Sequence, residues 1–159
     1  MEKMDLKLIN ALDTKDYETA TSLIEKNADV NVRDDEDGDT ALTYACVKGN
    51  PKIAELLIDK GADIDVKNIF SGWTALMQVC EKNCLEMATL LINAGANLDV
   101  KSIHGMTALM YVCEKNCLEM ATLLINAGAN LDIKDFWGET ALTYACWTGK
   151  LKIATLLVN

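Results

Sequence analysis

Proline, histidine and long apolar runs are scarce in this 159-residue chain. Pro51 is the only proline, His104 is the only histidine, and no stretch rich in Ser, Gly and Pro divides the sequence. We therefore expect one domain spanning residues 1–159. No apolar run approaches the ~20 residues that a membrane-spanning helix needs. The N-terminal MEKMDLKLIN carries charges where a secretory signal needs an apolar core.

The chain also lacks an excess of positive charge. Its 24 acidic residues and 15 Lys and Arg residues give a net charge of −9, which disfavours nucleic acids and anionic membranes as partners. Residues 1–40 hold 12 acidic and 5 basic side chains, for −7, and residues 41–159 hold 12 and 10, for −2. Six cysteines without an export signal are expected to be reduced thiols, so we expect a cytoplasmic protein.

Motifs for catalysis and cofactor binding are missing. Neither of the phosphate-binding patterns G-x-x-x-x-G-K and G-x-G-x-x-G occurs. A nucleophilic Cys or Ser would need a base beside it, but His104 lies in the turn SIHGM, where a surface contact is the better interpretation. The acidic segment RDDEDGD lacks the full spacing and the terminal Glu of a calcium loop. We expect no enzymatic activity, no cofactor and no metal.

What the chain does contain is a repeated segment. The twenty residues CEKNCLEMATLLINAGANLD occur at Cys80–Asp99 and again, unchanged, at Cys113–Asp132. Weaker copies precede and follow them, and the threonines of four T-A-L tripeptides fall 34, 33 and 33 residues apart, at Thr40, Thr74, Thr107 and Thr140. A period near 33 is typical of a stacked array in which each unit buries its apolar face on its neighbours.

The sequence of each unit predicts two helices and two turns. TALMYVCE is a short apolar helical segment, and CLEMATLLIN has apolar residues at helical spacing, which predicts an amphipathic second helix. Between these helices lies a residue that tolerates a positive φ, namely Gly49, Asn83, Asn116 or Gly149. Pro51 suits the first turn of a helix. A glycine then follows the second helix as its C-terminal cap, at Gly61, Gly95 and Gly128.

These features resemble the ankyrin repeat family over nearly the whole chain. The resemblance rests on G-x-T-A-L, on L-L-I before G-A-N or G-A-D, and on the period. It implies an all-α ankyrin-repeat solenoid, each repeat a helix-turn-helix followed by a β-turn or hairpin loop. The expected units are an N-terminal capping repeat at 1–33, repeats at 34–67, 68–101 and 102–134, and an incomplete repeat at 135–159.

One departure from the family recurs in every unit. The histidine that usually follows T-P-L or T-A-L, and braces the turn by hydrogen bonds, is replaced by Thr43, Met77, Met110 and Thr143. The departure bears on the rigidity of the hairpin loops and not on the fold.

The cysteines invite a metal interpretation, because Cys80 and Cys84, like Cys113 and Cys117, are four residues apart. The predicted turn separates each pair onto different helices, and the second ligand pair and histidines of a structural zinc site are absent. One repeat position carries cysteine in all four units, at Cys46, Cys80, Cys113 and Cys146, where the family usually has a buried alanine. We therefore interpret these cysteines as small apolar core residues.

The resemblance implies a protein-binding scaffold whose concave surface is formed by turn tips and the exposed ends of first helices. The residues at these positions, which we expect to contact a protein partner, are Glu36, Asp37, Asp39, Phe70, Trp73, Ile103, His104, Met106, Phe136, Trp137, Glu139 and Trp147. Aromatic residues are enriched at binding hot spots, so we expect the energetic centre at Trp73, Phe136, Trp137 and Trp147. The alternative is that neighbouring tips stack their aromatic rings only to rigidify the array.

Four cations recur just before the turns, at Arg33, Lys67, Lys101 and Lys134. Each has an aspartate close in sequence, so we interpret them as exposed ion pairs that contribute little to stability.

Two further alternatives concern the whole chain. The rival function is a purely structural spacer, or an engineered scaffold without a natural partner. The last repeat retains interior-type residues at Ile153, Leu157 and Val158, although the end of a solenoid normally needs a polar outer face. We therefore expect self-association through this repeat, or a longer protein from which the chain is cut.

Overall fold

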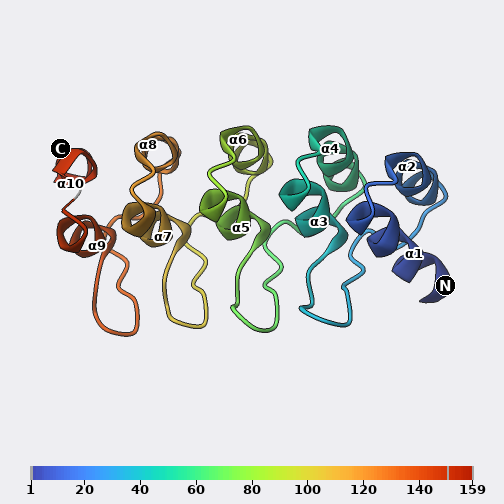
Figure 1. Ribbon diagram of the computed structural model, residues 1–159, viewed down its shortest axis with the longest axis horizontal. Helices are drawn as coiled ribbons and strands as arrows, with labels where there is room; N and C mark the ends of the chain where they lie inside the picture. The colour runs from blue at the N-terminus through green and yellow to red at the C-terminus, as the bar shows by residue number, and fades with distance from the viewer. Residues whose placement is uncertain (1, 150, 159) are drawn as a thin grey trace.

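The computed structural model describes residues 2–149 and 151–158, with side chains from residue 6 onward. In this part of the chain, helices form five antiparallel pairs arranged in a row, with the termini at opposite ends (Figure 1). The pairs are α1 (Glu2–Asp13) with α2 (Tyr17–Glu25), α3 (Ala41–Val47) with α4 (Pro51–Asp59), α5 (Ala75–Glu81) with α6 (Leu85–Asn93), α7 (Ala108–Lys115) with α8 (Leu118–Asn126), and α9 (Ala141–Trp147) with α10 (Leu151–Val158).

The helix boundaries follow from local sequence. The T-A-L threonines are N-caps, and each side-chain oxygen accepts the N–H three residues later, as in Thr40 to Thr43 at 3.2 Å. Positive φ values occur at the residues expected to separate the helices, Gly49, Asn83, Asn116 and Gly149, and at the expected caps Gly61, Gly95 and Gly128. Pro51 is the first residue of α4, where its missing N–H leaves no helical hydrogen bond unmade.

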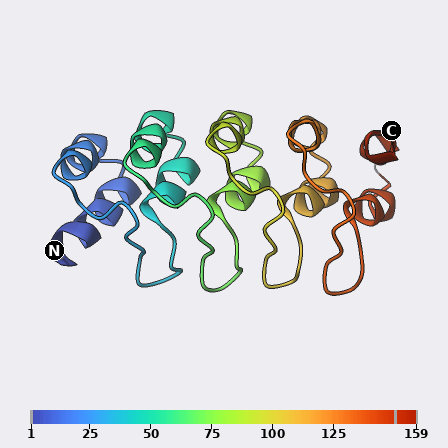
Figure 2. The same cartoon turned by 180° about the vertical axis from the view of Figure 1, so that it is seen from behind.

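The inner helices α1, α3, α5, α7 and α9 pack side by side in one layer, and α2, α4, α6, α8 and α10 form a second layer (Figures 1 and 2). The core lies between the layers and between successive pairs. Equivalent leucines line it in three successive units, and all are fully buried: Leu42, Leu76 and Leu109 from the inner helices and Leu57, Leu91 and Leu124 from the outer helices. The expected all-α solenoid is confirmed.

The recurring cations join neighbouring units through backbone carbonyls. Lys67 donates from Nζ to the carbonyl oxygen of Lys101 at 2.8 Å, and Lys101 donates likewise to Lys134 at 2.8 Å. The Arg33 guanidinium donates to the carbonyls of Gly38 and Lys67. The expectation that these cations pair with nearby aspartates is therefore wrong for Arg33, Lys67 and Lys101, because the next unit brings a backbone carbonyl within reach of each.

Two of the aspartates near these cations also connect neighbouring units. Asp65 accepts a hydrogen bond from the backbone N–H of Asn97 at 3.0 Å, and Asp99 accepts one from Asn130 at 2.9 Å. Both bonds link the loop after one outer helix to the same loop of the next unit. Neighbouring units are therefore joined by two sets of side chain-to-backbone hydrogen bonds, one from the lysines before the hairpin loops and one from the aspartates after the outer helices.

The four equivalent cysteines are buried to different extents along the array. Cys46, Cys80 and Cys113 are buried in the core, as expected. Cys146 is exposed, which corrects the expectation that all four equivalent cysteines are core residues. The reason is that α9 has an inner-helix neighbour on one side only among the described residues.

Candidate functional site

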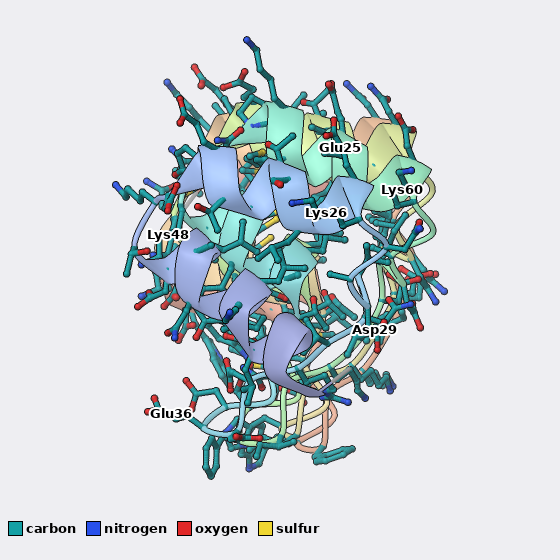
Figure 3. All side chains as sticks on the ribbon, turned by 90° about the vertical axis from the view of Figure 1, so that its right-hand side faces the viewer. Glu25, Lys26, Asp29, Glu36, Lys48 and Lys60 are labelled. Carbon is teal, nitrogen blue, oxygen red and sulfur yellow. The ribbon has the colours of Figure 1, made fainter. Side chains whose placement is uncertain are left out.

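Four hairpin loops project from the same side of the array, each between an outer helix and the next inner helix (Figure 1). We number them first to fourth: residues 34–39, 68–73, 102–106 and 135–139. Viewed along the array, Glu36 of the first loop and Lys48 at the end of α3 lie on one side, and Asp29 and Lys60 lie on the other (Figure 3). We call the first of these sides the open face; it comprises the loops and the C-terminal ends of the inner helices.

Each loop is folded around the side chain of its first residue. Oδ1 of Asp34 accepts the backbone N–H groups of Glu36, Asp37 and Gly38 at 2.7–2.9 Å. Asp135 does the same for Trp137 and Glu139 in the fourth loop, and Asn68 and Ser102 occupy this role in the second and third. The backbone of each loop is therefore held by a side chain that the sequence places at its start.

Tyrosines on three inner helices brace these same residues. The hydroxyl of Tyr44 donates to Oδ2 of Asp34 at 3.0 Å, and that of Tyr111 donates to Oγ of Ser102 at 3.0 Å. Tyr144 makes the equivalent bond in the fourth loop. These bonds tie the first, third and fourth loops to their inner helices, a role that sequence reasoning did not assign to the tyrosines.

Neighbouring loops are joined by backbone hydrogen bonds. The N–H of Ile69 donates to the carbonyl of Asp37 at 2.8 Å, and that of Ile103 donates to Ser71 at 3.0 Å. The N–H of Phe136 donates to His104 at 3.3 Å. The loop tips are thereby held side by side in a fixed order.

Glycine is required at the contact between successive loops. A Cβ on Gly72, whose φ is +66°, would lie 2.9 Å from the backbone nitrogen of Ile103. A Cβ on Gly105, with φ +78°, would lie 2.8 Å from the nitrogen of Phe136. Each tip residue thus packs over the glycine of the preceding loop.

The loop tips expose a row of large apolar side chains, although each loop is well ordered by hydrogen bonds. We call this row the tip ridge; its exposed fractions range from 51% to 73%, and its members are Ile69, Phe70, Ile103, Phe136 and Trp137. His104 is also exposed and stacks on Trp137, with ring centroids 5.8 Å apart. Ile69 was not among the expected contact residues, but its alignment with Ile103 and Phe136 in the repeat is the signal that finds it.

The four aromatic residues expected to form one centre have different surroundings. Trp73 is half-buried, donates from Nε1 to the Tyr111 hydroxyl at 3.1 Å and packs edge-on against its ring. Trp147 lies at the end of α9, is 67% exposed and touches Tyr144 edge-on. Trp73 therefore braces the second loop against α7 of the next unit, and less of its surface is available to a partner than for the exposed tip residues.

Three other expected contact residues also differ from the exposed tips. Met106 is 6% exposed and belongs to the core, so its side chain is not available to a partner. Asp39 and Glu139 are half-buried, and Oδ1 of Asp39 accepts a hydrogen bond from Gln78 at 2.8 Å. Glu36 and Asp37 are exposed, as expected.

Asp39 lies in an unfavourable electrostatic environment. Burial raises the pKa of its carboxyl, the bond from Gln78 opposes that shift, and the nearby charges of Asp34 and Asp37 add to it. A small hollow of about 160 Å³ beside Asp39 is lined by Tyr44, Lys48 and Gln78. The first loop therefore concentrates negative charge next to a recess on the open face.

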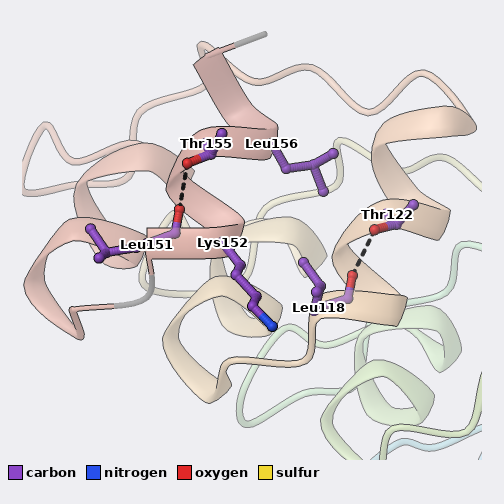
Figure 4. Close-up of a pocket in the computed structure, with 6 residues that line it drawn as sticks. All are labelled: Leu118, Thr122, Leu151, Lys152, Thr155 and Leu156. Atoms are coloured by element: carbon purple, nitrogen blue, oxygen red, sulfur yellow. Dashed lines mark hydrogen bonds between the residues drawn. The ribbon is translucent and has the colours of Figure 1, made fainter.

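A hollow of about 350 Å³ beside the first loop is lined by Glu36, Asp34 and Tyr44. Two larger hollows lie in grooves between outer helices. A groove of about 520 Å³ between α8 and α10 is lined by Leu118, Thr122, Leu151, Lys152, Thr155 and Leu156 (Figure 4). Another of about 470 Å³ lies between α4 and α6 and includes Glu55, Asp59 and Glu86. Neither groove contains any of the residues predicted to contact a partner.

The described residues offer no group of three or more His, Cys, Asp and Glu side chains arranged to hold a metal ion. In the same part of the chain, no helix combines the length and apolar character needed to cross a membrane.

Comparison with known proteins bears on the whole array. A search of curated proteins found no match to the chain. The family model described as ankyrin repeats (3 copies) matches residues 8–102 and 95–159, which together run from within α1 to the end of the chain and include all four loops. On that match, and on the stacked helix pairs with their projecting loops, the chain belongs to the ankyrin repeat family.

Proposed function

We propose that this chain is a non-catalytic interaction module that binds a protein partner through the tip ridge and Trp147. Ankyrin repeats are generally protein-interaction modules. The observation that carries the proposal is the tip ridge itself, with five large apolar side chains more than half exposed on hydrogen-bonded loops. Contiguous exposed apolar surface is typical of an interaction site.

The alternative is that the tip residues serve only to stiffen the array. It explains the contacts that some of them make with the preceding loop, but not their exposed surface. Ile69, Ile103 and Phe136 pack over the glycines of the preceding loops. Phe70, Trp137 and Trp147 are nonetheless 65–67% exposed, so most of their surface contacts no other residue of the chain. Trp147 supports the same point, because the equivalent residues Glu81 and Glu114 show that a charged side chain suits this position.

We expect the exposed acidic side chains of the first loop to affect the rate of association with the partner more than the affinity. Glu36 and Asp37 are exposed at one end of the tip ridge, and charges at the rim of an interface mainly alter the association rate and its salt dependence. The partner is accordingly expected to carry basic groups on the side that meets the first loop.

The test is comparative affinity capture from a lysate of the source cells, followed by mass spectrometry. Trp137→Ala and Trp147→Ala are measured beside wild type, and Lys60→Ala on the opposite side serves as the matched control. Truncating a central Trp anchor typically costs roughly 2–4 kcal/mol, or about 30- to 1000-fold in affinity.

We expect both Trp variants to lose the same captured protein while their free energies of unfolding stay close to wild type. The proposal is wrong if the variants unfold more easily but bind normally once folded. Equal capture by wild type and all three variants would favour the spacer function. The cytoplasmic location and the repeat boundaries drawn above stay predictions, as does self-association through the last repeat.

A further inference from the structure

The junction between the first and second loops has a different pair of side chains from the junction that follows it. At the second junction, the rings of Trp73 and Tyr111 pack with centroids 4.8 Å apart and share a hydrogen bond of 3.1 Å. The equivalent residues at the first junction are Asp39 and Gln78, and Nε2 of Gln78 donates to Oδ1 of Asp39 at 2.8 Å. Two smaller polar side chains therefore occupy the place of two aromatic ones.

Gln78 is the exception among the four equivalent residues of the inner helices. The other three are the tyrosines that tie the loops to their helices, namely Tyr44, Tyr111 and Tyr144. The segments Thr74–Lys101 and Thr107–Lys134 differ at only two positions, of which Gln78 against Tyr111 is one. Both segments form the same helix pair, so this difference changes the surface at the junction and leaves the fold of the unit as it is.

A recess lies beside the smaller pair, and we call it the junction recess. Its volume of about 160 Å³ is several times the ~30 Å³ that one water molecule occupies in the liquid. Its lining consists of Asp39 and Gln78 together with residues of α3 and its C-terminal end, namely Thr43, Tyr44, Val47 and Lys48. The recess thus lies between two complete neighbouring units, in the interior of the array.

The charge of Asp39 is not balanced within the recess. Among the described residues, the one ion pair within 4 Å joins Lys48 to Asp13 at 2.7 Å, so the cation in the lining is already engaged. Burial, followed by the charges of Asp34 and Asp37, raises the pKa of the Asp39 carboxyl against the hydrogen bond that it accepts. A carboxylate in such an environment beside a recess is typical of a binding site, here one suited to a positively charged group.

We propose that the junction recess binds an arginine side chain of the protein partner, with Asp39 as its counter-ion. A planar guanidinium donates two parallel hydrogen bonds to a carboxylate, and a carboxylate has about four acceptor sites, of which Gln78 uses one. Asp39 is half-buried, unlike Glu36 and Asp37, so we expect this contact to contribute to affinity as well as to the association rate. The inference rests on the proposed function, because it takes the cation from the same partner.

The first test titrates the protein with N-acetylarginine amide and follows the side-chain amide of Gln78 and the backbone N–H groups of Thr43 and Val47 by NMR. We expect saturable shifts with a dissociation constant in the millimolar range, as suits one charge-assisted contact. N-acetylcitrulline amide has nearly the same shape without the charge, and we expect it to bind at least about tenfold more weakly.

Two variants change the recess in different ways. Asp39→Asn removes the charge, and Gln78→Tyr fills the space with the residue that the other three units carry. We expect each to weaken arginine binding at least about fivefold. Glu81→Gln is the matched control, since it removes one charge about a turn from Gln78 at an exposed position outside the lining, and we expect no more than about a twofold effect. Asp39→Asn should lose binding while becoming more stable at neutral pH, a combination that general loss of structure cannot produce.

The proposal is overturned if the citrulline derivative binds as well as the arginine derivative, if no saturable shift occurs, or if Glu81→Gln weakens binding as much as Asp39→Asn. Affinity capture gives a separate check, in which Gln78→Tyr should reduce recovery of the protein that wild type retains. Unchanged recovery would contradict the assignment of the side chain to the partner. Arginine binding in the recess together with normal capture by Trp137→Ala and Trp147→Ala would count against the tip ridge alone.

Discussion

The hydroxyl of Tyr144 donates to Oδ2 of Asp135 at 2.6 Å, tying the fourth loop to α9. Asp135 is buried, and burial alone would raise the pKa of its carboxyl. The bonds from Tyr144 and from the N–H groups of Glu139, Trp137 and Gly138 outweigh burial, so the pKa lies below its ordinary value. Burial and this bond together raise the pKa of Tyr144.

This contact predicts a stability that depends on pH. A carboxyl whose pKa is lowered by folding stabilises the fold above the unfolded-state pKa of about 4 and loses that effect as pH falls through the folded-state pKa. We expect Asp135→Asn to be less stable than wild type at neutral pH and to lose less stability on acidification. Urea unfolding across a pH series measures both, and identical pH profiles would contradict the prediction.

The hydroxyl of Tyr144 can be tested separately. Tyr144→Phe removes a hydrogen bond to a charged acceptor, and we expect a loss of about 1.5–3 kcal/mol in the free energy of unfolding. Tyr17→Phe is the control, because the Tyr17 hydroxyl has no hydrogen-bond partner among the described residues. Similar losses of unfolding free energy in both variants would show that the hydrogen bond to Asp135 does not contribute to stability.

Asp39 predicts the opposite dependence on pH. Burial, followed by the charges of Asp34 and Asp37, raises the pKa of its carboxyl against the bond from Gln78. The ionised form therefore destabilises the fold at neutral pH, and this effect disappears as pH falls below the unfolded-state pKa. We expect Asp39→Asn to stabilise the protein at neutral pH by up to about 1 kcal/mol and to have little effect at about pH 3. Destabilisation at neutral pH would contradict this.

Two loop glycines allow a matched comparison. Gly105 and Gly138 both have positive φ, +78° and +85°, but only Gly105 has another loop packed against it. Gly138→Ala is expected to cost about 1–2 kcal/mol for the backbone conformation alone. Gly105→Ala should cost more, because its Cβ would meet the backbone of Phe136. Chemical unfolding measures the difference. Equal losses of unfolding free energy in the two variants would mean that the fourth loop shifts at little cost to accommodate the Cβ.

Trp73 is predicted to be a structural residue. Trp73→Phe keeps an aromatic ring but removes the hydrogen bond to the Tyr111 hydroxyl, and we expect a loss of roughly 1 kcal/mol in stability. Partner capture by the folded protein should be unchanged. A variant with normal stability and lost binding would return Trp73 to the interaction surface.

The cysteines should differ in reactivity in the native protein. Burial raises the pKa of Cys46, Cys80 and Cys113 to about 12, with a smaller contribution from Cys84 to Cys46 and from Cys117 to Cys80. The thiolate is the reactive form, so these three should be alkylated slowly and the exposed Cys146 first. All six should react after denaturation without reductant; fewer than six modified thiols would contradict the expectation of free cysteines.

Repeat equivalence explains which exposed positions sequence reasoning located. Phe136, Trp137 and Trp147 were placed correctly on the exposed surface because the T-A-L register locates every tip and helix end. The same register placed Trp73 and Met106 there too, although one is half-buried and the other is in the core. Register assigns a residue to a position in the loop, but not the direction in which its side chain packs.

The helix pairs, their N-caps and the positive φ values between paired helices and after the outer helices could be predicted from the sequence, because each depends on interactions within a few residues of the chain. The hydrogen bonds of Lys67 and Lys101, the brace between Trp73 and Tyr111, and the exposure of Cys146 could not be predicted and are seen only in the folded structure. These features depend on what the adjacent unit brings within reach. Burial in a stacked array is a property of two neighbouring units, so identical residues in identical local structure, such as Cys113 and Cys146, have different surroundings.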